Sequence, residues 1–260
     1  PPIADGIALL TYTSGTTGVP KGVAITNGAL VQWFRAAESD PDTAWRSSDV
    51  GLMVMPNFHL AGTWVSLPAL MHGATLVVLP AFEPDTFLSA VSEYGVTRTC
   101  LVPTAIEAVV QALHNYPADL TSLRSVMYAG SPIASHTLRS VIDAFDCDLV
   151  QFYGTTETFI ITLLRPDQHR LDAAQILRSC GQPMPPVRVR LIDDNGADVS
   201  DGVPGEVLVR SPWMFGGYWR NQEATQAVLS DGWYHTGDVA FRDQDGNLHL
   251  VDRLKDMIVT

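Results

Sequence analysis

Short apolar runs alternate with helical runs through the first part of this sequence, and this alternation restricts the fold more than any other feature. Strand-like runs occupy residues 51–55, 74–79, 97–102, 125–128 and 149–152. Between them, one helical run ends near residue 70, and three others occupy 84–93, 105–115 and 135–145. Repeated strand–helix units predict a parallel sheet covered by helices on its faces. Ligands of such sheets bind beyond the carboxyl ends of the strands, where functional residues are therefore expected.

The two ends of the chain follow different patterns. Before the alternation, residues 7–12 read as a strand, and Thr26 is the predicted N-cap of a helix that Pro41 ends. After about Cys180, prolines and tight turns separate the short strand-like runs 187–192, 205–210 and 248–251. This second pattern predicts a small antiparallel, barrel-like β subdomain. We expect an α/β fold, with an α/β subdomain portion over 1–178, the antiparallel subdomain over 179–252, and a last segment over 253–260.

Composition excludes several classes of function. Of the 260 residues, 46% are hydrophobic and 17% charged, as in soluble globular proteins of one or two domains. The formal net charge of −12 argues against nucleic acid or an anionic membrane as the main partner. Three cysteines without a C-x-x-C pair predict neither a disulfide framework nor a zinc site. No secretory signal and no uninterrupted apolar run of about 18 residues is visible, so we expect a cytoplasmic protein without a transmembrane segment.

A glycine- and hydroxyl-rich stretch, residues 13–22, follows the first strand. Its glycines permit positive φ angles, its N–H groups and hydroxyls can surround an anion, and Lys21 adds a charge that reaches a phosphate. Pro20 before Lys21 distinguishes it from the common P-loop. A flexible hairpin without a ligand is the alternative. The candidate phosphate-binding residues are Thr13, Ser14, Gly15, Thr16, Thr17, Gly18 and Lys21.

Three further motifs carry groups suited to a nucleotide. In 151–157, Tyr153 could stack on a base, and Glu157 could bind Mg²⁺ beside phosphates, unless it is merely solvated on a surface turn. In 234–238, Asp238 could accept hydrogen bonds from both hydroxyls of a ribose, unless the motif is an ordinary turn; His235 is expected to be structural. At the end of the chain, Arg253 is either a ligand contact or part of a solvated strand end.

In this order the four motifs resemble those of the adenylate-forming superfamily, which includes acyl-CoA synthetases, firefly luciferase and the adenylation domains of peptide synthetases. The resemblance spans nearly the whole chain and is most specific over the ten positions 13–22. One departure is Asp252, where many members have glycine before the arginine. The resemblance assigns Tyr153 to adenine, Thr156 to phosphate, Glu157 to Mg²⁺, Asp238 to ribose, Arg253 to ribose or phosphate, and Lys255 to a hinge. Lys21, Thr156 and Glu157 are the predicted catalytic residues, and Gly130, Ser131, Gly154 and Thr155 complete the predicted nucleotide-binding set.

The residues that select the acid are less distinctive. His59 follows Phe58 where amino-acid-activating relatives carry an aspartate that pairs with the substrate ammonium. Because a buried ammonium without a carboxylate is costly, an amino-acid substrate is disfavoured. Small residues leave room for an apolar acyl chain, although close packing explains them equally well. The predicted substrate-binding residues are His59, Gly62, Ala129 and Gly130, with Ala61 and Ser131 as further small residues nearby.

The resemblance implies activation of a hydrophobic, fatty-acid-like carboxylic acid by MgATP, with release of pyrophosphate, and transfer of the acyl group to coenzyme A. A fatty acyl-AMP ligase that loads a carrier protein and a non-catalytic nucleotide-binding fragment are the alternatives. The chain begins at Pro1 without methionine and corresponds to the second half of the family's N-terminal domain. We therefore expect a fragment that lacks the first part of that domain and the C-terminal domain, is inactive alone, and self-associates.

Overall fold

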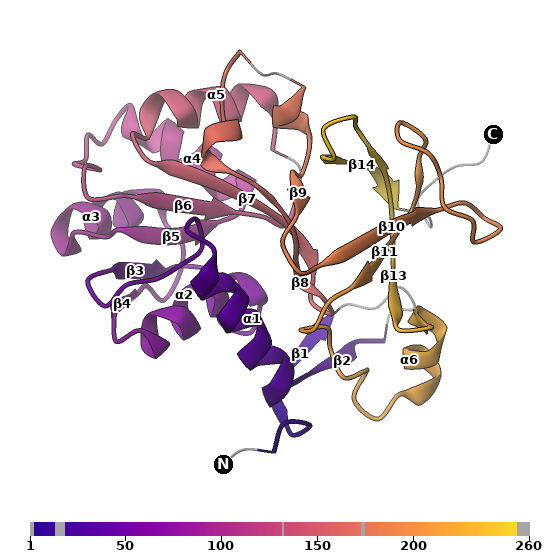
Figure 1. The fold of residues 1–260 in the computed structure, drawn as a ribbon. Helices are drawn as coiled ribbons and strands as arrows, with labels where there is room; N and C mark the ends of the chain where they lie inside the picture. The colour runs from indigo at the N-terminus through magenta and orange to yellow at the C-terminus, as the bar shows by residue number, and fades with distance from the viewer. Residues whose placement is uncertain (1–2, 14–18, 132, 173–174, 254–260) are drawn as a thin grey trace. The chain divides into compact units, whose positions relative to one another are not determined.

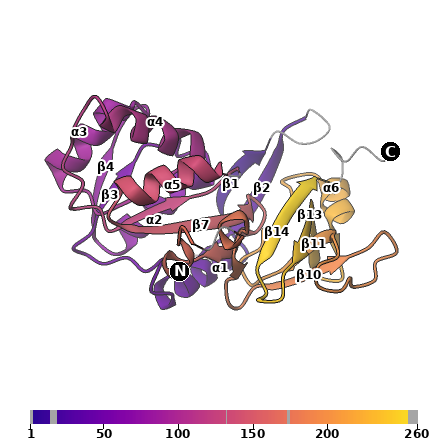
Figure 2. The same ribbon diagram turned by 90° about the horizontal axis from the view of Figure 1, so that it is seen from above.

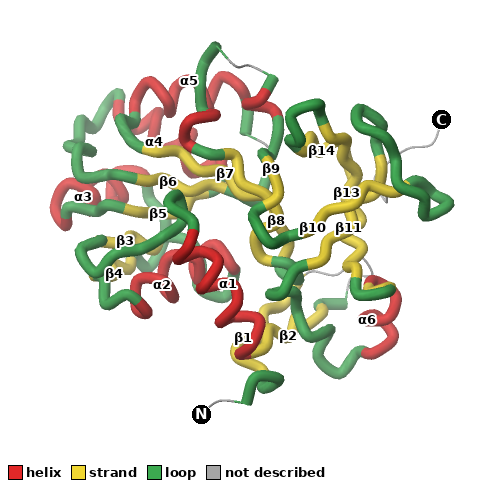
Figure 3. The backbone as a smooth tube through the Cα atoms, viewed as in Figure 1, coloured by secondary structure: helices red, strands yellow, loops and turns green. Residues whose placement is uncertain are grey.

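The computed structural model describes residues 3–13, 19–131, 133–172 and 175–253. The chain forms two compact units (Figures 1 and 3). Unit 1 comprises Pro1–Ala37, Tyr153–Leu163 and Ser179–Thr260, and unit 2 comprises Glu38–Phe152 and Leu164–Arg178. The division of the chain into subdomains at residues 178 and 252 remains a prediction.

Unit 2 contains the predicted parallel sheet with its helices. Parallel pairing joins its strands in the order β4-β3-β5-β6-β7. The elements are β3 (Val50–Met53), α2 (Leu60–Met71), β4 (Thr75–Val78), α3 (Pro84–Tyr94), β5 (Arg98–Leu101), α4 (Pro103–Leu113), β6 (Ser125–Tyr128), α5 (Ser135–Ala144) and β7 (Asp148–Thr155), followed later by the short helices η1 (Pro166–Gln168) and η2 (Ile176–Arg178). The α/β fold class is confirmed.

The strand order reverses direction at β3, which decides the face that each helix covers. The connection β3–α2–β4 runs one way along the sheet, whereas α3, α4 and α5 follow connections that run the other way. Because such crossovers are right-handed, α2 covers the face opposite to α3, α4 and α5, as Figures 1 and 2 show. On the α2 face, the Trp64 and Phe152 rings meet edge to face at 5.2 Å.

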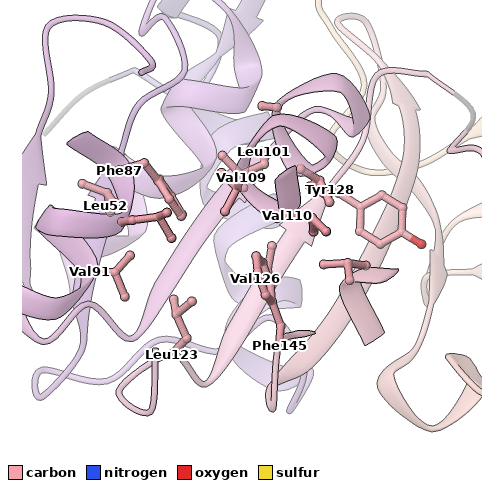
Figure 4. Close-up of a cluster of buried hydrophobic side chains, with 14 of the residues drawn as sticks. Leu52, Phe87, Val91, Leu101, Val109, Val110, Leu123, Val126, Tyr128 and Phe145 are labelled. Carbon is pink, nitrogen blue, oxygen red and sulfur yellow. The ribbon is translucent and has the colours of Figure 1, made fainter. Parts of the chain in front are cut away.

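The main hydrophobic core of unit 2 lies between the sheet and α3, α4 and α5 (Figure 4). Phe87 of α3, Val109 of α4 and Val126 of β6 are completely buried in it. Burying a side chain of this size stabilises the folded state by about 1.5–3 kcal/mol relative to exposure. The amphipathic spacing seen in the sequence of these helices therefore results in one continuous core.

An ion cluster lies at the amino ends of the parallel strands. Asp49, just before β3, is almost completely buried and pairs with Arg98 Nε at 3.3 Å and with Arg124. Burial lowers the pKa of Arg98, and the Asp49 carboxylate opposes that shift. Since this cluster lies at the end of the strands opposite to the expected ligand edge, it anchors the sheet rather than a substrate.

Unit 1 contains the predicted antiparallel sheet. The strand order is β10-β11-β13-β12, and β14 pairs with β13. The elements of the unit are β1 (Ile7–Thr13), β2 (Lys21–Thr26), α1 (Asn27–Ser39), β8 (Phe159–Leu164), β9 (Gln182–Pro183), β10 (Arg188–Ile192), β11 (Gly205–Arg210), α6 (Gln222–Val228), β12 (Leu229–Ser230), β13 (Trp233–Arg242) and β14 (Leu248–Arg253), with the last residues of α1 and β8 passing into unit 2.

Sequence reasoning missed several elements of unit 1. The first strand does not join the parallel sheet, because β1 pairs antiparallel with β2. We did not predict β2, since it begins within the glycine-rich stretch. Neither β8 nor β13 was predicted: the apolar run of β8 received no assignment, and the part of β13 that carries a predicted ligand motif was read as a turn. The prediction for Thr26 is confirmed: its hydroxyl accepts a hydrogen bond from Ala29 N at 3.1 Å at the start of α1. In the described residues, no helix is both long and apolar enough to span a membrane.

Candidate active site

The predicted phosphate-binding stretch connects the two strands of the β1–β2 hairpin. Thr13 at the end of β1 lies in register opposite Lys21 at the start of β2, so both ends of the connection are fixed. The predicted residues Ser14, Gly15, Thr16, Thr17 and Gly18 lie outside the described residues. Of the seven predicted phosphate-binding residues, the structure therefore places Thr13 and Lys21.

The motif 151–157 spans the end of β7 and the turn into β8. A Cβ at Gly154 would lie 1.7 Å from the carbonyl oxygen of Phe159, so the turn requires glycine there. Thr158 closes the turn by accepting a hydrogen bond from Thr155 N at 3.1 Å. Phe159 adopts a φ of 55°, a conformation rare for a bulky residue, and its buried ring stacks on Trp33 at 5.3 Å. The turn is thus rigidly built.

Glu157 lies in this turn and is buried, with 6% of its surface exposed. Its Oε1 accepts a hydrogen bond from the hydroxyl of Tyr218 at 2.8 Å. The ammonium of Lys21 lies 5.1 Å from the centre of the Tyr218 ring, within the range of a cation–π interaction. A carboxylate and a cation from two separate motifs therefore contact the same tyrosine.

Residues 215–219, which we call the connecting segment, link these two motifs through the main chain. Phe215 N donates to the carbonyl oxygen of Glu157 at 2.8 Å. On the other side, Gly216 N donates to Ala24 O at 2.8 Å, and Trp219 N donates to Gly22 O at 2.7 Å. The connecting segment thus pairs with β2 and at the same time holds the turn that carries Glu157.

Two tyrosines beside Glu157 remain protonated. Burial first, and then the Glu157 carboxylate, raise the pKa of Tyr218 and that of Tyr234 above the usual range of a phenol. The hydroxyl of Tyr218 is therefore a permanent hydrogen-bond donor at neutral pH. The ring of Phe215 packs against both tyrosines, with its centre 5.1 Å from that of Tyr218 and 5.5 Å from that of Tyr234.

The chemistry of Glu157 fits a magnesium ion that phosphates also hold. Within the described residues, Oε2 of Glu157 has no hydrogen-bond donor, and no group of three or more His, Cys, Asp or Glu side chains could hold a metal. Mg²⁺ commonly binds one or two carboxylates together with substrate phosphates and water. The described donors therefore suit a metal that arrives with a nucleotide, not a closed all-protein site.

Tyr153 and Asp238 form a buried pair in unit 1. The Tyr153 hydroxyl donates to Asp238 Oδ2 at 2.8 Å, and the two residues are 8% and 7% exposed. Burial and the nearby carboxylate raise the pKa of Tyr153 well above its usual value. The side chains predicted to contact adenine and ribose are thus joined to each other.

A bulge in β13 determines where Asp238 lies. Glu206 of β11 pairs with Val239 and Leu208 pairs with His235, so that Val207 alone faces residues 236–238. Thr236 donates to Val207 O at 2.8 Å and accepts from Asp238 N at 3.0 Å. Bulges of this kind redirect a side chain. The T-G-D motif is therefore a strand bulge and not an isolated turn.

His235 and Arg253 lie next to this bulge. His235 is partly buried between Ser230 Oγ, 2.8 Å from Nε2, and Glu206 Oε2, 3.0 Å from Nδ1, in line with the structural role expected for it. The backbone of Arg253 in β14 is in register with Asp238. Lys255 and the remainder of the predicted hinge lie outside the described residues.

The predicted substrate-binding residues lie in unit 2, after the carboxyl ends of β3 and β6. His59 is exposed and caps α2, its Nδ1 accepting a hydrogen bond from Ala61 N at 3.2 Å. A Cβ at Gly62 would lie 2.5 Å from Pro56 O, so this glycine is needed for close packing. Ala129 is half-buried, whereas Gly130 and Ser131 are exposed, and Gly130 has a φ of 95°.

Sequence reasoning missed Tyr218 and Phe215 and assigned no role to Tyr234. The available signal was the glycine pair that precedes Tyr218: Gly217 has a φ of 125°, and a Cβ at Gly216 would lie 3.0 Å from Thr26 Cγ2. Paired glycines next to an aromatic residue indicate a close approach of two backbones. The sequence does not reveal which second segment makes that approach.

Comparisons with known proteins agree with this architecture. The family described as AMP-binding enzyme matches residues 1–219. The chain is 33% identical over 250 residues to the fatty acid–[acyl-carrier-protein] ligase ScoC of Streptomyces coeruleorubidus, covering 95% of this chain and 48% of that protein. It is 39% identical over 257 residues to a feruloyl-CoA synthase of an Amycolatopsis species, covering 98% of this chain and 51% of that protein.

A solved structure of a related enzyme has the same fold. The O-succinylbenzoate coenzyme A synthetase MenE of Bacillus subtilis, in complex with ATP and magnesium ion, superimposes with a TM-score of 0.87 at 28% identity. The match covers 100% of this chain and 52% of that one. The chain thus spans about half the length of each of these three proteins.

Proposed function

Since the chain belongs to the family of AMP-binding enzymes, we propose that its protein activates a carboxylic acid with ATP and then transfers the acyl group to the thiol of coenzyme A. In the first step a carboxylate oxygen attacks the α-phosphorus of ATP, the bond to the β-phosphate oxygen breaks, and acyl-AMP and pyrophosphate form. In the second step the thiol replaces AMP at the acyl carbon. The first step needs no protein nucleophile.

The observation that carries this proposal is the contact of Glu157 and Lys21 with the same Tyr218 side chain. Pyrophosphate gains negative charge as it departs, and a preorganised cation next to it stabilises the transition state. Lys21 supplies that cation, and the hydroxyl of Thr156 is a donor to the same phosphates. Glu157 is the residue that would hold Mg²⁺, which supplies further neutralisation of phosphate charge when bound.

The nucleoside half of ATP is assigned to Tyr153 and Asp238. Their hydrogen bond holds the carboxylate in one orientation before any ligand arrives. A single carboxylate accepts hydrogen bonds from both hydroxyls of a ribose, and the tyrosine ring offers a face to adenine. Orientation of the substrates in this way removes part of the entropic barrier of the reaction.

We assign a hydrophobic acid, of the fatty-acid type, to the edge of unit 2 that carries His59 and Gly130. These residues follow β3 and β6, and the strand order reverses at β3. Ligands of open α/β sheets bind at the carboxyl edge beside such a reversal. His59 offers no negative charge to a substrate ammonium, which favours an acid without an amino group.

A carrier protein is the second candidate acceptor. It is favoured by the likeness to the ligase ScoC, whose name gives an acyl-carrier protein, whereas the feruloyl-CoA synthase is named for coenzyme A. The two relatives also differ in the acid that they are named for. Incubating the full-length protein with acid, MgATP and either coenzyme A or phosphopantetheinylated carrier protein separates the two candidates by the thioester that forms.

The adenylation step is tested by pyrophosphate exchange into ATP, measured for the full-length protein over a panel of carboxylic acids. Lys21→Ala and Glu157→Gln should each lower the exchange rate by about ten- to a thousandfold, as expected for the loss of one electrostatic contact. The matched control is Glu223→Gln, an exposed glutamate on α6, which should exchange at the wild-type rate. Wild-type exchange by Lys21→Ala and Glu157→Gln would refute these roles. Nucleotide binding without exchange for any acid would indicate a non-catalytic binding protein.

A further inference from the structure

We propose that Tyr218 is a positioning residue of the adenylation site, which orients Glu157 through its hydroxyl and seats the ammonium of Lys21 through its ring. This inference rests on the proposed function, because it assigns Glu157 to the metal and Lys21 to the phosphates. It adds a residue that none of the four sequence motifs contains. Tyr218 itself touches neither the metal nor the reacting atoms.

The hydroxyl of Tyr218 fixes one oxygen of Glu157. The 2.8 Å hydrogen bond to Oε1 is, among the described residues, the one that the carboxylate accepts. It leaves Oε2 as the oxygen that would hold a metal. Because the residue is buried, losing this donor would leave a charged oxygen without a partner, which is costly and allows the side chain to turn. Groups that orient metal ligands in this way typically change metal affinity by about 10–100-fold when they are removed.

The ring of Tyr218 serves the second catalytic group. Lys21 Nζ lies 5.1 Å from the ring centre, where the negative face of an aromatic ring attracts a cation. A flexible lysine side chain is thereby restricted to one region before a phosphate binds. One side chain thus couples the position of the predicted metal ligand to that of the predicted phosphate-binding cation.

Tyr218 is well suited to this role because its own backbone is held on two sides. It bridges Val23 of β2, and its N–H donates to Thr225 Oγ1 at 2.9 Å. Thr225 lies on α6, whose first turn is capped by Asn221 accepting from Ala224 N at 2.9 Å. A rigid support is what a positioning residue needs, since a displacement of the supporting backbone would move both catalytic groups.

The test measures metal binding directly and not turnover. Mn²⁺, used as a paramagnetic probe in place of Mg²⁺, is titrated into the full-length protein saturated with α,β-methylene-ATP, and free Mn²⁺ is followed by electron paramagnetic resonance. Tyr218→Phe, which keeps the ring, should weaken Mn²⁺ binding about tenfold. Glu157→Gln should weaken it at least as much. Tyr116→Phe, which removes an exposed hydroxyl bonded to Ser89, is the matched control and should bind as wild type.

A double mutant separates positioning from a general structural effect. If Tyr218 acts through Glu157, adding Tyr218→Phe to Glu157→Gln should cause no further loss of Mn²⁺ affinity. The ring is tested without metal: Tyr218→Leu should weaken binding of the ATP analogue about threefold to tenfold, whereas Tyr218→Phe should not. Circular dichroism and the melting temperature confirm that each variant is folded.

The outcomes distinguish this inference from the proposed function. Wild-type Mn²⁺ affinity in Tyr218→Phe, together with weak binding by Glu157→Gln, would overturn the positioning role and leave the proposed function intact. Additive losses in the double mutant would likewise refute action through Glu157. Wild-type Mn²⁺ affinity in Glu157→Gln would refute the metal assignment itself, and the inference with it.

Discussion

The Tyr153 hydroxyl donates a hydrogen bond to Asp238 at 2.8 Å, and this contact joins the end of β7 to the bulge of β13. Both side chains are buried, so the hydrogen bond is shielded from water and the carboxylate is held in place. The two predicted nucleoside contacts, one for the base and one for the sugar, therefore depend on each other.

Removing the Tyr153 hydroxyl should weaken ATP binding, because Asp238 is then held less well for its contact with the ribose. A hydrogen bond to a charged group contributes about 1.5–3 kcal/mol, and part of that is lost when Tyr153→Phe leaves Asp238 less well held, so we expect roughly fivefold weaker ATP binding by calorimetry. Asp238→Ala should lose more. With 2′,3′-dideoxy-ATP, which lacks both ribose hydroxyls, Tyr153→Phe and wild type should bind alike. A loss of equal size for both nucleotides would show that Tyr153 does not act through Asp238.

The chain length of the acid should determine its apparent affinity. Each CH₂ group that becomes buried contributes up to ~0.8 kcal/mol, so KM in the exchange assay should fall along a series of straight-chain acids and then level off where the pocket ends. The deaminated analogue of each amino acid should be preferred over the amino acid itself, because His59 offers no negative charge to an ammonium. A preference for free amino acids would contradict the assignment.

His169 should make unit 2 sensitive to acid. It is buried, with Nε2 2.9 Å from the Tyr128 hydroxyl and Nδ1 2.8 Å from Arg165 O. Burial lowers its pKa from 6.5 to about 4, so the folded state holds the neutral ring while the unfolded state takes up a proton. This contribution to stability is present above pH 6.5 and is lost as the pH falls to about 4, by on the order of 3 kcal/mol.

The measurement is urea unfolding of the full-length protein at several pH values between 4 and 7. His169→Gln keeps an amide donor and an acceptor but does not titrate, so its free energy of unfolding should fall less steeply in this window. The Arg170–Asp172 pair is exposed and gives a surface variant, Asp172→Asn, for comparison. Equal slopes for wild type and His169→Gln would remove His169 as the cause.

Expressed as residues 1–260, the chain should self-associate. Among the described strands, β1 pairs with β2 alone, and it carries the exposed apolar side chains of Leu10 and Tyr12, the latter 60% exposed; Val31 is exposed on α1. An unpaired strand edge with exposed apolar side chains is a site of association between copies. Light scattering should show species larger than a monomer, and Tyr12→Lys should lower their fraction. A strictly monomeric wild-type chain at high concentration would contradict this expectation.

Local patterns in the sequence predicted the elements whose residues repeat regularly. The parallel strands, α3, α4 and the capped start of α1 follow directly from apolar spacing, prolines and the Thr26 hydroxyl. Strands that carry ligand motifs were read as loops, because glycine and polar residues mask their periodicity. Thus β2 begins at Lys21, and β13 contains Gly237 at a φ of 72° within its bulge.

Contacts between distant residues could not be predicted in this way. The hydroxyl of Tyr218 reaches across 61 positions to Glu157, and that of Tyr153 across 85 positions to Asp238. Resemblance named three of these four residues but not their partners, since it reports one motif at a time. Tyr218 lies outside the motifs, and only folding brings it into contact with Glu157 and Lys21.

The order in which the two units are assembled from the chain has a consequence for biosynthesis. Unit 1 needs Pro1–Ala37, Tyr153–Leu163 and Ser179–Thr260, while most of unit 2 comes from the single stretch Glu38–Phe152. At about 5–20 residues per second, roughly 7–30 s pass on the ribosome between residue 37 and residue 179. During that interval β1, β2 and α1 have left the exit tunnel without the strands that complete their unit. The apolar faces of β1, β2 and α1 are therefore open to a chaperone during this interval.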